Sequence, residues 1–288
     1  MQFATGELTM ADSNMSFYPE GLPANRWRLF SIPGIIDSNE IKPNDLEDGH
    51  VFYDWDPVAE SWFKPDSIVI GRAYWFKHKY DEPVIFSNKD TTGYSVPLES
   101  YEIKLHQGAN MVGSPFPFPV RAEWNEGVSQ PYKYGSDLKE GWADTNVFEP
   151  WAGYAVQSTS DSGKITFYPI QDTTIAARTA NSGWRLNLDL SSNSSFDRTS
   201  AIGRCDVCEE NVDMNDMPLL PSLTQRVFIS LDIINDGQFD YSKDLRSTSE
   251  FNGVWNMRVN RPNAEGSLTL KGAYDNDKPN DLVLMIVN

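Results

Sequence analysis

Long apolar runs are missing from the sequence. A membrane helix needs about 18 or more consecutive apolar residues, and the longest candidate, DLVLMIVN at positions 281–288, is only strand-sized. We therefore expect no membrane insertion. The first residues, MQFATGELTMADSN, also lack the basic and apolar regions of a signal peptide. The chain is expected to be either a cytosolic protein or a mature or excised piece.

Basic residues are scarce. Lysine and arginine together number 24 against 41 aspartate and glutamate residues, which gives a formal net charge of −17 and a pI near 4.5. Nucleic acids and anionic membranes are bound through clustered Lys and Arg, so neither is an expected partner. An acidic surface instead suits solubility, cation binding or a salty exterior. The frequent use of Asn, Ser, Thr, Gly and Trp favours an extracellular or cell-surface location.

Cysteine and histidine are also rare. The two cysteines, Cys205 and Cys208, lie far from the three histidines (His50, His78 and His106), so the four ligands of a structural zinc site are not at hand. A reactive thiol needs positive charge nearby, whereas acidic residues surround this pair. The remaining alternatives are a disulfide that closes a small loop and two free buried thiols. The extracellular interpretation favours the disulfide.

Helical periodicity is likewise missing. No stretch of eleven or more residues has apolar residues at the i, i+3, i+4 and i+7 positions of an amphipathic helix. Short runs that are rich in aromatic and β-branched residues, and bounded by turn residues, recur instead. They read RWRLFSI, AYWFKHKY, PVIFSN, YEIKLHQ, GYAVQST, KITFYPI, WRLNLDL, RVFISLDII, VWNMRVN, GSLTLKG and DLVLMIV. The sequence therefore predicts an all-β fold.

A set of three features occurs twice in the same order: a strand that ends at a proline, an aromatic hairpin, and a glycine-containing turn that leads into an aromatic strand. The first copy reads WRLFSIP, FYDWDPVAESWF and GRAYWF, and the second reads GANMVGSPF, PYKYGSDLKEGW and PWAGYAV. The distance from Trp27 to Tyr74 is 47 positions, and that from Ala109 to Tyr154 is 45. Because the spacing is nearly equal, we predict a duplicated β unit.

The duplication sets the expected domain boundaries. We predict a first β domain at residues 1–178, built from two repeated units at about 27–100 and 105–170. The phrase SGWRLNLDLSS, from Ser182, opens like the first copy but is not followed by the matching aromatic strand. We therefore expect a different module at residues 179–288, an immunoglobulin-like or jelly-roll-type β-sandwich.

The order of motifs resembles a known group of proteins. The repeated phrases are followed by WRLNLDL, DRTSAIG, DMNDMPLLP, RVFISLDI, KDLRS and VWNMRVN. This order resembles non-catalytic β-rich regions of large secreted or surface proteins that are exported by the type IX secretion system. The stretch CDVCEEN departs from that pattern, and no sorting tail follows. The resemblance implies a piece of a longer secreted or surface polypeptide and supplies no activity.

Two acidic loops are candidate calcium sites, and calcium is the one cofactor that the sequence suggests. Calcium takes about six to eight oxygen ligands, which Asp and Asn side chains could supply in DVCEENVDMND and DNDKPND. The candidate ligands are Asp213, Asp216, Asp275 and Asp277. Neither loop has the spacing of an EF-hand. In so acidic a chain, solvated loops are the simpler interpretation.

Familiar catalytic motifs are not found. The sequence has no G-x-S-x-G and no H-E-x-x-H. A pair of carboxylates could hydrolyse glycosides, but 41 acidic residues do not single out a pair. We therefore expect a protein that is not an enzyme, with a secreted hydrolase as the third alternative.

Tryptophan is abundant, with nine in the chain. Large aromatic side chains that recur at equivalent motif positions are expected in the core; these are Trp27, Trp75, Trp151, Trp184 and Trp255. Hairpin aromatics lie near loop tips, where binding residues are common. Tyr53, Trp62 and Trp142 are therefore the candidate ligand-binding residues, on which a sugar ring could stack.

The sequence thus favours a non-catalytic structural or interaction module of a secreted or cell-surface protein, acting in adhesion or extracellular assembly. Other modules or subunits of the assembly are the expected partners. The alternative is a carbohydrate-binding accessory module, whose partner would be a glycan.

Overall fold

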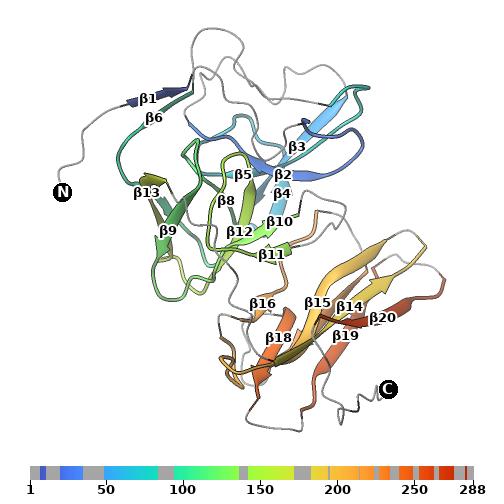
Figure 1. Cartoon of the computed structure of the whole chain (residues 1–288). Coiled ribbons are helices and arrows are strands. Elements are labelled where there is room, and N and C mark those ends of the chain that lie inside the picture. Colours follow the sequence, from blue (N-terminus) through green and yellow to red (C-terminus); the bar gives the residue numbers. More distant parts are fainter. Residues whose placement is uncertain are drawn as a thin grey trace. The chain divides into compact units, whose positions relative to one another are not determined.

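The computed structural model is shown as a cartoon in Figure 1. The described residues are 7–10, 20–34, 49–83, 94–135, 142–171, 183–193, 195–213, 215–223, 227–233, 240–248, 253–262, 266–275 and 283. Every regular element within them is a β-strand, so the prediction of an all-β fold is confirmed. None of these residues belongs to a helix that could cross a membrane.

The chain divides into two compact units, Met1–Ile175 and Ala176–Asn288. The boundary predicted from the sequence, after residue 178, falls three positions later than this division. Residues 172–182, which contain the predicted connection, lie outside the described part of the chain.

The described part of the first unit contains thirteen strands in four sheets. The sheets have the orders β2-β5-β3-β4, β8-β12-β10-β11, β7-β13-β9 and β1-β6. The strands are β1 Glu7–Met10, β2 Arg28–Ser31, β3 His50–Asp56, β4 Ser61–Phe63, β5 Ala73–His78, β6 Tyr94–Pro97, β7 Tyr101–Lys104, β8 Gly108–Gly113, β9 Val120–Trp124, β10 Tyr132–Tyr134, β11 Trp142–Asp144, β12 Gly153–Ser158 and β13 Lys164–Gln171.

The two four-stranded sheets have the same connectivity. Strands β2, β5, β3 and β4 correspond in order to β8, β12, β10 and β11, and the β1–β6 pair corresponds to β7–β13. We therefore call residues 7–97 repeat 1 and residues 101–171 repeat 2. Each repeat begins one strand earlier than the copies expected at 27–100 and 105–170, because β1 and β7 carry no aromatic phrase. Strand β9 has no counterpart in the described part of repeat 1.

The strand registers place Tyr74 and Tyr154 at equivalent positions. Tyr74 lies opposite Phe30, and Tyr154 lies opposite Val112. Both tyrosines are fully buried. Each hydroxyl accepts a hydrogen bond from the backbone N–H five residues earlier, that of Val69 at 2.8 Å for Tyr74 and that of Glu149 at 2.6 Å for Tyr154. The tyrosine is therefore the shared element of the two phrases.

The glycines of the two phrases are not equivalent. When the tyrosines are aligned, Gly71 corresponds to Trp151, and both have positive φ, +84° and +67°. An L-residue with a side chain pays for this conformation with about 1–2 kcal/mol. Trp151 is 1% exposed and packs in the core of repeat 1, and this burial offsets the backbone cost. Gly153 corresponds instead to Ala73. Glycine is required at this position because a side chain would overlap Leu29.

The two repeats approach each other through small residues. A Cβ atom added to Gly153 would lie 2.4 Å from Leu29 Cγ, and one added to Gly113 would lie 2.0 Å from Ser31 Cβ. Matching backbone hydrogen bonds join the two sheets. Ser31 N–H donates to Trp151 O at 3.4 Å, and Gly113 N–H donates to Gly71 O at 3.0 Å. These two bonds are equivalent under the alignment of the repeats, so the interface has approximate twofold symmetry.

Aromatic side chains of each repeat cover strands of the other. The Trp55 indole donates to Ala109 O in repeat 2 at 2.8 Å. In the opposite direction, Tyr134 and Trp142 of repeat 2 pack edge-on against Trp75, with ring centroids 4.6 and 6.3 Å away. Each repeat has its own hydrophobic core, and these aromatic contacts join the two repeats.

The second unit is a single curled sheet in the described residues. Its order is β19-β17-β18-β15-β14-β20, with β16 paired to β18, and only β15–β18 is parallel. The strands are β14 Gly183–Ser191, β15 Phe196–Cys205, β16 Met217–Pro218, β17 Phe228–Asp232, β18 Tyr241–Ser247, β19 Asn256–Asn260 and β20 Thr269–Tyr274.

The core of the second unit explains the curl. Leu188 and Leu190 of β14 pack with Ile229 and Leu231 of β17, although β15 and β18 separate these strands in the sheet. The sheet must therefore bend until its two ends face each other across the apolar core. This arrangement is consistent with the predicted β-sandwich.

The contact between the repeats gives a first prediction. Gly113→Ser should lower the free energy of unfolding by about 1–3 kcal/mol, because the new side chain overlaps Ser31. Urea denaturation monitored by tryptophan fluorescence measures this change. A single variant as stable as the parent would contradict the close approach.

The matched control exchanges the two residues. In Ser31→Gly with Gly113→Ser, the new hydroxyl lies near Arg72 O, just as the Ser31 hydroxyl donates to Ala152 O at 2.7 Å. Because Arg72 and Ala152 are equivalent positions, the double variant should recover at least half of the lost stability.

Candidate functional site

The three aromatic residues predicted to bind a ligand differ in their exposure. Trp62 and Trp142 occupy equivalent hairpin positions, opposite Trp55 and Tyr134. Trp142 is only 9% exposed, which leaves little of its ring for a ligand. The reason is the contact between the repeats, since the hairpin lies against Trp75 of the other repeat.

Trp62 and Tyr53 are half-buried. Trp62 packs on Trp55, with ring centroids 4.8 Å apart. Tyr53 packs on Trp27 with centroids 5.8 Å apart, and Trp27 is also half-buried. The Lys77 ammonium lies 5.7 Å from the centre of the Trp27 ring. We call Trp27, Tyr53 and Lys77 the aromatic face.

The sequence assigned Trp27 to the core, and this is wrong in part. Trp27 precedes β2, which begins at Arg28, and its counterpart in repeat 2 is the buried Ala109. In repeat 2 that position receives the Trp55 indole, whereas in repeat 1 the tryptophan remains half-exposed. The sequence did carry a signal for this difference in exposure. The large residue Trp27 occupies the position that the small residue Ala109 occupies in the other repeat.

The proposed calcium ligands brace a loop. Asp213 accepts hydrogen bonds from the N–H groups of Glu209 at 2.7 Å and Asn215 at 2.5 Å. Asp216 accepts from Asp213 N–H at 2.9 Å and Leu245 N–H at 2.8 Å. The carboxylates therefore satisfy backbone donors that would otherwise be unpaired in this turn-rich segment.

The other predicted calcium ligands do not join this loop. Asp275 forms an ion pair with Arg185 at 2.7 Å and accepts a hydrogen bond from Asn187. Asp277 lies outside the described residues. Among the residues that are described, no cluster of three or more His, Cys, Asp or Glu side chains has the geometry to hold a metal ion.

Cys205 and Cys208 are joined by a disulfide, with Cα atoms 5.2 Å apart. Both are about 5% exposed. Cys208 N–H also donates to Cys205 O at 3.3 Å, so the bridge closes a tight turn directly before the loop that Asp213 braces.

A group of arginines and tryptophans borders this turn. Arg246 lies 4.9 Å and Arg204 lies 5.7 Å from the centre of the Trp255 ring. Arg246 also binds Asp244 at 2.8 Å, and both side chains are almost fully buried. The buried charges are paired, as burial in a low-dielectric environment requires. This group therefore stabilises the end of β18 and the segment before β19.

One pair of acids in repeat 1 has the opposite pKa shifts that hydrolases use. Burial raises the pKa of Asp54, although Arg72, 2.7 Å away, opposes the shift. The N–H groups of Ala59 and Val58 lower the pKa of Asp56. Asp54 is 2% exposed and closed off by its arginine, whereas Asp56 holds the turn between β3 and β4.

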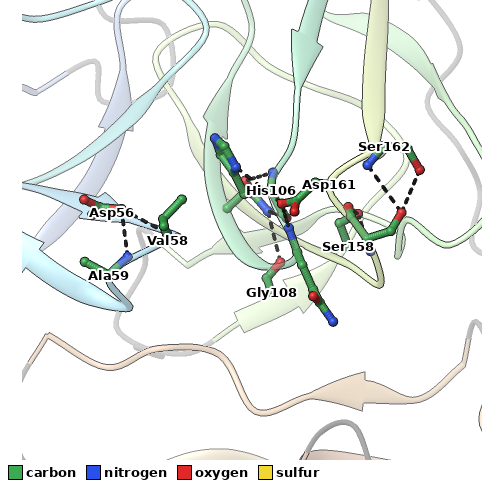
Figure 2. A network of polar contacts seen from close by, with 11 residues as sticks. Asp56, Val58, Ala59, His106, Gly108, Ser158, Asp161 and Ser162 are labelled. Carbon is green, nitrogen blue, oxygen red and sulfur yellow. Dashed lines mark hydrogen bonds and ion pairs between the residues drawn. The ribbon is translucent and has the colours of Figure 1, made fainter.

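Figure 2 shows this turn and a neighbouring polar network. His106 Nδ1 lies 3.4 Å from an Asp161 carboxylate oxygen, which also accepts Gln107 N–H at 2.9 Å. The Ser160 and Ser162 hydroxyls are 2.7 Å apart. His106 and Asp161 are exposed, at 54% and 76% of their side chains. The network therefore ties two surface loops together.

Histidine His78 is buried and structural. Its Nε2 lies 2.6 Å from Leu22 O, and its Nδ1 accepts Tyr80 N–H at 3.2 Å. Because Nδ1 accepts this bond, Nε2 carries the proton that is donated to Leu22 O.

Comparison with protein-family models, with curated proteins and with solved structures found no match. The function of the chain is therefore inferred from its own residues.

Asp216 gives a pH-dependent prediction. It is 3% exposed, and desolvation raises its pKa to about 7. Between about pH 4 and pH 7 the folded state binds more protons than the unfolded state, so this group makes stability fall as pH rises and has no further effect above pH 7. The loss should be on the order of a few kcal/mol.

Urea unfolding of the parent and of Asp216→Asn between pH 4 and pH 8 measures this effect. The variant should lose this part of the pH dependence, even if it is less stable at every pH because the asparagine amide group accepts only one of the two N–H groups. Parallel pH profiles for the two proteins would contradict the shifted pKa.

The disulfide gives a third prediction. Protein prepared without reductant should have no thiol that can be alkylated. Reduction should increase the intact mass by that of two hydrogen atoms. The double variant Cys205→Ala/Cys208→Ala should lose about 2 kcal/mol of stability, because the cross-link restricts the unfolded chain. Two thiols that react with alkylating reagent before reduction would show that the bridge is not formed.

Proposed function

We propose that the chain is a non-catalytic structural or interaction module of a secreted or cell-surface protein. The observation that carries this proposal is the use of the buried carboxylates. Asp54, Asp216 and Asp244 are each held by an arginine or by backbone N–H groups. Such bonds let these carboxylates stabilise loops and sheets.

The location rests on two supports. A disulfide is typical of proteins in oxidising compartments, and Cys205 and Cys208 form one. The motif order also resembles that of regions exported by the type IX secretion system. We therefore propose an extracellular or cell-surface location, with other modules or subunits as partners in adhesion or assembly.

A carbohydrate-binding accessory module is the second candidate. The aromatic face favours it, because Trp27 and Tyr53 are half-exposed and Lys77 lies near the Trp27 ring. Flat aromatic rings with a polar neighbour suit the stacking of a sugar ring.

A test of turnover separates these proposals from a hydrolase. The purified chain should release no reducing sugar from a polysaccharide panel and no peptide from casein. Asp54→Asn and Asp56→Asn, the variants of the acid pair with opposite shifts, should behave like the parent. Robust hydrolysis that either substitution abolishes would overturn the non-catalytic proposal.

A further inference from the structure

One face of the β2-β5-β3-β4 sheet has an open region. In β5, Tyr74 and Phe76 point into the core of repeat 1, so alternation places Trp75 and Lys77 on the opposite face. Tyr53 of β3 lies opposite Trp75 and shares that face. Tyr134 and Trp142 cover Trp75, whereas Trp27, Tyr53 and Lys77 remain half-exposed.

Unpaired cations border this region. Lys77 is half-exposed, and Lys79 and Arg26 are exposed close to it or to Trp27 in sequence. None of the three forms an ion pair within the described part of the chain. The acids that follow in sequence, Asp81 and Glu82, make no ion pair with them either. In a chain with a formal net charge of −17, Lys77 beside the Trp27 ring and the exposed cations Lys79 and Arg26 form a local surface suited to an anion.

We propose that the aromatic face, Trp27, Tyr53 and Lys77, binds an acidic polysaccharide. A sugar ring stacks on the tryptophan and tyrosine, and its carboxylate is bound by the lysine side chains. The cation held over the Trp27 ring places the positive charge next to the stacking surface, where a uronic acid carries its carboxylate. This inference rests on the proposed non-catalytic function and names its ligand class.

The chemistry distinguishes this ligand from others. A neutral glycan would use the rings and leave the cations without a role. A polyuronate matches both features, because each of its sugars has one apolar face and one carboxylate.

The experiment compares oligogalacturonate with the same oligomer after methyl esterification, by isothermal titration calorimetry. The two probes share the ring and differ in charge. We expect the parent to bind the acidic probe at least tenfold more tightly. Raising the salt from about 0.1 M to about 1 M, which shortens the Debye length from about 10 to about 3 Å, should weaken the binding.

Three variants test the residues. Trp27→Ala should abolish binding through lost stacking, and Lys77→Met should weaken it at least fivefold through lost charge. Lys104→Met, an exposed lysine of β7, is the control and should bind as the parent does. Should Trp27→Ala fail to fold, the surface change Lys77→Met with Lys79→Met still tests the site.

Other outcomes overturn the inference. Equal affinity for the two probes would indicate a neutral-glycan site, and equal affinity for polyglutamate would indicate binding to negative charge alone. Lack of binding, with no hydrolysis, would reject this site and leave the non-catalytic function standing. Cleavage of the oligogalacturonate would overturn the proposed function itself.

Discussion

The close approach of the two repeats is the contact on which the first unit depends. Gly113 and Gly153 lack side chains, so the backbone of β8 and β12 lies directly against Ser31 and Leu29. Only at this distance do backbone hydrogen bonds pass between the sheets. The same distance lets the hairpin aromatics of one repeat pack on the strands of the other, and these contacts in turn decide which rings are buried and which stay accessible.

The prediction of the duplication rested on local evidence. Each phrase needs a tyrosine whose hydroxyl accepts a hydrogen bond from the preceding loop, and the spacing from Trp27 to Tyr74 and from Ala109 to Tyr154 follows from that need. The equivalence of Gly71 with Trp151 was not predictable, since tryptophan rarely adopts positive φ. The burial of Trp142 was not predicted because the residue that covers it, Trp75, lies far away in the sequence.

The acidic residues show a different limit of prediction from sequence. A carboxylate that binds calcium and one that accepts backbone N–H groups occur in the same kind of Asp- and Asn-rich loop. They differ in the direction in which the backbone donors point, as the bonds of Asp213 and Asp216 illustrate. The aromatic face was predicted in part, because Tyr53 was identified while Trp27 was assigned to the core and Lys77 was not considered.

Trp151 also affects the order in which the chain can fold during synthesis. It belongs to repeat 2 in sequence but packs with Phe30, Tyr74 and Phe76 in the core of repeat 1. A growing chain that ends before Trp151 has therefore made every strand of repeat 1 without the ring that fills its core. Domains generally fold in order from the N-terminus as they emerge. Here the core of the first repeat is completed only after most of the second repeat has been synthesised. Until then, its apolar side chains need protection from aggregation.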